Sequence, residues 1–101
     1  MSKLEAINQA LIEIGFIIED VMYTLERKSQ KHFVINGQHQ VQEFTHIFKM
    51  SYIGDAIFLD DENNEIEGSE LCGFDVLDEQ EHSLTTLYVE SVNDLRYYLN
   101  I

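Results

Sequence analysis

The dipeptide Asn36-Gly37 is the feature that most restricts what this chain can fold into. Both residue types readily adopt positive φ, which a two-residue type I′ turn requires at both of its central positions. Residues 32–35, just before the turn, favour extended structure. The sequence therefore predicts a β-hairpin here. Residues 40–50 fit either a helix or a strand by their apolar spacing, and we favour the strand because the turn calls for a partner.

A helix is expected at the N-terminus. Ser2 and Glu5 form an S-x-x-E capping box, and apolar residues follow at helical spacing: Leu4, Ile7, Leu11, Ile14, Ile18, Val21 and Leu25. Arg27, Lys28 and Lys31 come where the C-terminus of such a helix favours positive charge.

Gly15 interrupts this helical stripe. We favour a helix that bends or stops at Gly15; the alternative is a helix that ends at Ile14, with Gly15 as its C-cap and residues 16–25 in a strand. The same spacing of apolar residues also fits a coiled coil. Further apolar side chains lie outside this stripe, so the helix is expected to be buried on more than one side, which favours packing against a sheet.

The second half of the chain reads as strands followed by a helix. Further β-favouring runs lie at 56–59, 65–67, 71–77 and 84–89. Short polar residues predict a hairpin tip at 60–64 and a second acidic loop at 78–82. Ser91, with Asp94 three residues later, predicts the start of a short terminal helix. The expected fold is α+β, with an N-terminal amphipathic helix packed on a small antiparallel sheet and a short C-terminal helix.

Composition predicts a single folded domain over residues 1–101. Apolar residues make up 45% of the chain, well above the content of acidic disordered sequences. A single cysteine rules out an internal disulfide, and we expect a cytoplasmic protein without a membrane span.

The charge is unevenly distributed along the chain. The first 49 residues hold 6 acids and 5 bases, whereas Met50 to Leu95 holds 13 acids and neither Lys nor Arg. The formal net charge is -13. Such a chain is not expected to bind nucleic acid or anionic membranes directly, because both interactions rely on basic side chains. A basic protein surface is the expected partner, and the chain is expected to be a monomer or a homodimer.

The sequence shows no pattern typical of a metal site or of a catalytic site. Registers of a calcium loop that begin at Asp60 or Asp61 fail at the sixth and twelfth positions. His32, His39 and His46 cannot share one face of a hairpin, and Cys72 has apolar or anionic neighbours that do not activate a thiolate. We therefore expect no metal site, no cofactor and no enzymatic activity.

The acidic residues of the second half form the candidate partner-binding site: Asp55, Asp60, Asp61, Glu62, Glu65, Glu67, Glu70, Asp78, Glu79 and Glu81. In a strand, Asp60 with Glu62 and Glu65 with Glu67 would form rows of carboxylates that resemble a phosphate backbone. Candidate apolar anchors beside these rows, each also suited to the core, are Tyr52, Phe58, Phe74 and Tyr88.

Three classes of function fit these observations. The first is an inhibitor that occupies the nucleic-acid groove of a nuclease or defence complex; in size and charge the chain is similar to the small acidic proteins that phages use against restriction or CRISPR systems. The second is an immunity protein that neutralises a bacterial toxin. The third is an adaptor or structural subunit whose acidity only keeps it soluble.

Overall fold

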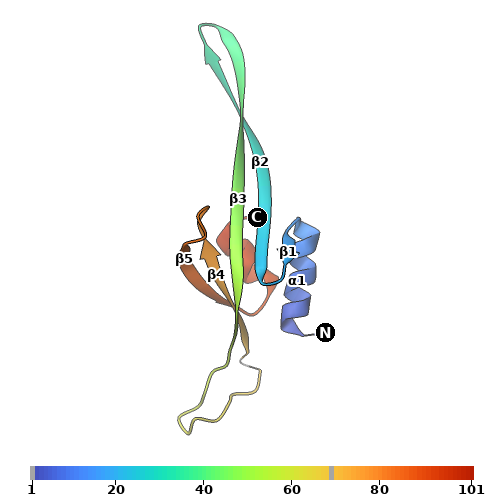
Figure 1. The fold of residues 1–101 in the computed structure, drawn as a ribbon, viewed down its shortest axis with the longest axis vertical. Coiled ribbons are helices and arrows are strands. Elements are labelled where there is room, and N and C mark those ends of the chain that lie inside the picture. The colour runs from blue at the N-terminus through green and yellow to red at the C-terminus, as the bar shows by residue number, and fades with distance from the viewer. Residues whose placement is uncertain (1, 69) are drawn as a thin grey trace.

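The computed structural model describes residues 2–68 and 70–101. The elements, in chain order, are α1 (Lys3–Ile14), β1 (Ile17–Glu19), β2 (Met22–Ile35), β3 (Gln38–Ala56), β4 (Leu71–Leu77), β5 (Ser83–Val89) and α2 (Val92–Leu99). The five strands form one antiparallel sheet in the order β1-β2-β3-β4-β5. The predicted α+β architecture is therefore confirmed (Figure 1).

The hairpin predicted at Asn36-Gly37 joins the two longest strands. Asn36 has φ 50° and Gly37 has φ 77°, as a type I′ turn requires. β2 and β3 then pair without interruption from Ile35 opposite Gln38 to Met22 opposite Ser51. The strand interpretation of residues 40–50 is thus correct.

Helix α1 stops at Ile14. Gly15 adopts φ 124°, and its N–H donates to the carbonyls of Leu11 and Ile12 at 3.1 Å. The alternative that makes Gly15 a C-cap is the correct one, although residues 16–25 form β1 and the start of β2 with a turn between them. The expected placement of Arg27, Lys28 and Lys31 at a helix C-terminus is wrong, because pairing with β3 makes this segment a strand.

Both helices contribute to a single core on one face of the sheet. Its central ring is Phe74 of β4, which is fully buried and meets Tyr23 of β2 edge-on at 5.2 Å between ring centroids. The Tyr23 hydroxyl donates to the Asn8 side chain of α1 and so ties the helix to the sheet. The buried apolar residues are Ile7, Leu11, Phe16, Tyr23, Leu25, Met50, Cys72, Phe74, Val76, Val89, Leu95 and Leu99.

The C-terminal elements agree with the sequence pattern. Strands β4 and β5 lie where the runs at 71–77 and 84–89 placed them. The Asp94 carboxylate accepts hydrogen bonds from the backbone N–H groups of Glu90 and Ser91, at 3.0 and 3.3 Å, at the start of α2. Leu95 and Leu99 of this helix are buried in the core.

The strands expected at 56–59 and 65–67 do not form. β3 ends at Ala56, and the described residues between it and β4 form a single isolated bridge, Leu59 to Glu65. We call residues 57–70 the acidic loop, since they carry six carboxylates and no Lys or Arg.

The molecule is elongated, with principal extents of 70 × 25 × 22 Å. Residues 26–47, the outer parts of β2 and β3 with their turn, extend beyond the rest of the sheet, and we call them the arm. The acidic loop projects from the opposite end (Figure 1). No helix in the described part of the chain is long and apolar enough to cross a bilayer.

Candidate protein-binding surfaces

The acidic loop is held in shape by Asp60. Its carboxylate Oδ1 accepts hydrogen bonds from the backbone N–H groups of Glu62 and Asn64, at 2.8 and 2.9 Å. The Asp60 N–H donates to the Asn64 carbonyl at 2.9 Å, and the Asn63 N–H donates to the Asp60 carbonyl at 3.0 Å. These bonds close a local turn of the kind that aspartate favours. Asp60, which is itself exposed, therefore shapes the loop in addition to contributing charge.

The remaining carboxylates of the loop face solvent. Asp61, Glu62, Glu65 and Glu67 are exposed, and in the described part of the chain no Lys or Arg forms an ion pair with any of them. Apolar side chains are exposed beside them, including Phe58 (58%), Leu59 (53%) and Ile66 (46%). These four acidic residues thus combine charge that no base pairs with and neighbouring apolar surface. A base comes close only at the end of the loop, where Lys3 Nζ donates to the Glu70 carbonyl at 2.7 Å among the described residues.

The second acidic loop, residues 78–82, repeats the same turn. Asp78 Oδ1 accepts from the N–H groups of Gln80 and His82, at 2.9 and 2.8 Å. His82 also lies 3.6 Å from the other Asp78 oxygen. Here, however, a base lies close: Lys49 Nζ is 3.8 Å from Glu81 and donates to the Glu79 carbonyl at 3.4 Å. This loop is partly neutralised by the chain itself.

The ten predicted site residues do not form one surface. The acidic loop and the 78–82 loop lie at opposite ends of β4, while Asp55 lies in β3 (Figure 1). The expected strand rows of Asp60 with Glu62 and of Glu65 with Glu67 are wrong, because these residues lie in a loop. The acidic loop nonetheless brings six of the ten together: Asp60, Asp61, Glu62, Glu65, Glu67 and Glu70.

Asp55 takes part in an internal polar contact. It accepts a hydrogen bond of 2.5 Å from the Tyr52 hydroxyl, and this bond, together with burial, raises the pKa of Tyr52 to about 12. Burial is also the main cause that raises the pKa of the Cys72 thiol, with a further contribution from Asp55. Cys72 is buried and reduced, as expected of a core thiol.

Of the four aromatic candidates for apolar anchors, two belong to the core and two are exposed. Phe74 is fully buried and Tyr52 packs against it, so both belong to the core. Phe58 lies exposed in the acidic loop. Tyr88 is exposed on the face of the sheet opposite the helices, because its neighbours Leu87 and Val89 point to the core.

Sequence reasoning missed the basic character of the arm. The arm holds three bases, Arg27, Lys28 and Lys31, and only two acids, whereas the rest of the chain holds three bases and 17 acids. None of the three arm bases pairs with a carboxylate among the described residues, whereas Lys3 and Lys49 both do. Counting charge over hairpin partners, instead of over halves of the sequence, would have revealed this polarity.

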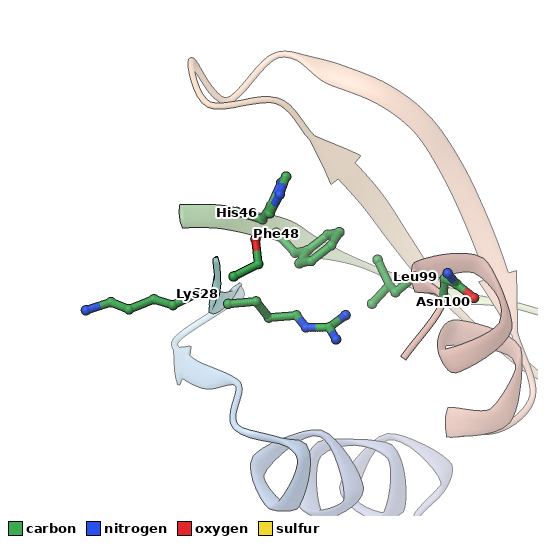
Figure 2. Close-up of a pocket in the computed structure, with 7 residues that line it drawn as sticks. Lys28, His46, Phe48, Leu99 and Asn100 are labelled. Carbon is green, nitrogen blue, oxygen red and sulfur yellow. The ribbon is translucent and has the colours of Figure 1, made fainter. Parts of the chain in front are cut away.

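A shallow pocket of about 340 Å³ lies at the base of the arm. It is lined by residues of β2, of β3 and of the C-terminal end of α2 with its C-cap: Arg27, Lys28, Ser29, His46, Phe48, Leu99 and Asn100. Figure 2 shows that Phe48 and Leu99 form its apolar side, whereas the Lys28 side chain extends away from α2. The pocket is open and mixed in polarity, and it lacks a set of catalytic groups.

The histidines of the arm do not converge. Alternation along the paired strands puts His32 and His39 on one face of the arm and His46 on the other. Among the described residues, no three His, Cys, Asp or Glu side chains are close enough together to hold a metal ion.

A comparison with protein-family models, curated proteins and solved structures finds no match to this chain. Its function must therefore be inferred from its own geometry and charge.

Proposed function

We propose that this protein binds the basic surface of a partner protein through its acidic loop, and that this surface is one on which the partner holds nucleic acid. The observation that supports the proposal is the set of exposed carboxylates at Asp61, Glu62, Glu65 and Glu67, which no base of the described chain neutralises. The partner is a nuclease, a defence complex or a toxin with a groove lined by Lys and Arg.

The loop has the properties that such binding requires. Charge accelerates encounter and selects the partner, whereas apolar contacts at the centre of an interface supply much of the affinity. Phe58 and Leu59 provide exposed apolar surface within the same loop. The Asp60 turn fixes part of the loop before binding, which lowers the entropy lost on association.

The position of the loop also favours this function. It projects from one end of an elongated molecule, away from the arm bases that would otherwise weaken its field (Figure 1). A projecting loop can enter a groove that a flat surface cannot reach. The 78–82 loop is less suited, since Lys49 neutralises part of it.

The experiment is capture of binding proteins from an extract of the source cell or its host. The test variant carries Asp61→Asn, Glu62→Gln, Glu65→Gln and Glu67→Gln and leaves Asp60 intact. A matched control removes four carboxylates elsewhere, with Glu5, Glu13, Glu19 and Glu26 changed to Gln. Both variants have the same net charge, so they separate the position of the charge from its amount.

We expect the loop variant to lose the captured partner and the control to retain it. For the isolated partner, the association rate constant at low salt should fall about tenfold or more with the loop variant, because steering is lost. Equal capture by both variants would refute the proposal. Capture that depends neither on salt nor on either set of changes would favour the third class of function, an adaptor or structural subunit. The identity of the captured protein then distinguishes a toxin from a defence complex.

A further inference from the structure

The arm exposes two long strand edges. β1 pairs with β2 only at residues 22–24, and β4 pairs with β3 only from Lys49 onward. Within the described chain, no strand pairs with the outer edges of 25–35 and 38–48. Each edge therefore presents a row of backbone N–H and C=O groups that can pair with another strand.

Two strands alone form a weak structure. An isolated two-stranded hairpin is marginally stable in water, and a third strand or a covering layer is usually needed. Among the described residues no third strand pairs with the arm, and the end of α2 lies near its base only. The arm also exposes apolar side chains near its tip, including Val34 (58%) and Val41 (55%). Additional strands would cover backbone and apolar groups together.

The two edges differ in chemistry. The β2 edge carries Arg27, Lys28 and Lys31, and charged residues of this kind discourage edge pairing. The β3 edge over 38–48 contains no Lys, Arg or Pro, and Glu43 is its only acid. Pairing is thus least opposed along β3.

We propose that this chain forms a two-fold symmetric dimer in which the β3 edges of two arms pair antiparallel, giving a four-stranded sheet. Charge opposes this arrangement less than it opposes contact between the two acidic bodies. Antiparallel pairing places the two strongly acidic bodies at opposite ends, and the arms, each with three bases and two acids, meet in the middle. The acidic loops, at the far ends, take no part, so this inference is independent of the proposed function.

The register follows from the turn. Because Ile35 and Gln38 close the two-residue turn, the N–H groups of His39, Val41 and Glu43 point to the outer edge. Pairing Val41 with its symmetry mate places Glu43 opposite His39 of the partner subunit, a carboxylate acceptor opposite an imidazole N–H donor. The self-complementarity of an isologous interface is thereby satisfied.

The first test is the mass of the intact protein in solution, measured by light scattering after size exclusion. The chain has a mass of 11.8 kDa, and we expect twice that value. A monomer at about 100 μM, a concentration at which even an interface of ~10 μM affinity would be largely filled, would overturn the proposal.

Two proline variants identify the edge. Val41→Pro removes an outward N–H from β3, and Val34→Pro removes an outward N–H from β2; both side chains are exposed and lie on the same face of the arm. We expect Val41→Pro to be monomeric and Val34→Pro to remain dimeric. Any other pattern of masses would overturn the proposal.

Cross-linking provides a readout that does not disturb the backbone. Val41→Cys should form a disulfide-linked dimer under mild oxidation, whereas Val34→Cys should not, because only the Val41 pair meets at the two-fold axis. The native Cys72 is buried and does not interfere. Equal cross-linking of both variants, or of neither, would contradict the β3 interface.

Discussion

Replacing Asp60 tests whether the acidic loop is preorganised. Asp60→Ala removes the acceptor for the N–H groups of Glu62 and Asn64, whose hydrogen bonds measure 2.8 and 2.9 Å. A typical hydrogen bond contributes about 0.5–1.5 kcal/mol net, and these are exposed, so we take about 1–2 kcal/mol for the pair. The opening equilibrium of the turn should therefore shift by roughly 5–30-fold.

Amide hydrogen exchange measures this shift residue by residue. Protection of the Glu62 and Asn64 amides should fall by that factor in Asp60→Ala, while the free energy of global unfolding changes by less than about 0.5 kcal/mol, as is usual for a surface site. Asp60→Asn keeps a side-chain oxygen in place and should retain most of the protection.

The Asp78 turn is an internal control, since it has the same two bonds in a loop at the other end of β4. Exchange at Gln80 and His82 should not change in either Asp60 variant. If Asp60→Ala leaves the Glu62 and Asn64 amides as protected as before, the loop is not held by this carboxylate and the preorganisation inferred for it is wrong.

Three further predictions concern the sheet and its core. Gly73→Ala should destabilise the fold by about 1–3 kcal/mol in urea unfolding, because a Cβ there would lie 2.9 Å from the Gly54 carbonyl oxygen; unchanged stability would contradict this packing. Leu11→Ala should cost about 2–5 kcal/mol, since this side chain is fully buried, and a loss below 1 kcal/mol would show that the helix packs loosely. For Tyr52, whose raised pKa favours the neutral phenol, the stability advantage over Tyr52→Phe should be constant from neutral pH to about pH 10 and disappear as the pH rises toward about 12; a difference that does not vary over this range would refute the Asp55 bond.

Local sequence signals located most of the fold. Each of these signals acts over a few residues, and the structure has the corresponding element in each case. They are the Asn36-Gly37 turn, the capping residues Ser2 and Ser91, and the β-rich runs at 71–77 and 84–89. Such signals are readable because turn and cap preferences are largely independent of the tertiary fold.

The extent of the elements was harder to predict. Ile18, Val21 and Leu25 continue a helical spacing by coincidence, whereas in the structure they belong to β1, the following turn and β2. Only the pairing of β2 with β3 over its full length decides between these states, and pairing between distant residues is not encoded locally.

The candidate site was predictable in composition but not in geometry. The sequence shows that acids gather between residues 55 and 81, yet it does not show that Asp60 and Asp78 shape turns, or that Lys49 partly neutralises the 78–82 loop. These roles depend on hydrogen bonds and on contacts between strands that are far apart in sequence.

The most direct measurement for the proposed function is competition on the captured partner. The partner, bound to immobilised wild-type protein, is challenged with duplex DNA or RNA at constant ionic strength. We predict that nucleic acid displaces the partner, because the acidic loop and the phosphate backbone occupy the same basic groove. A partner that binds this protein and nucleic acid at the same time, each with unchanged affinity, would contradict the proposed function.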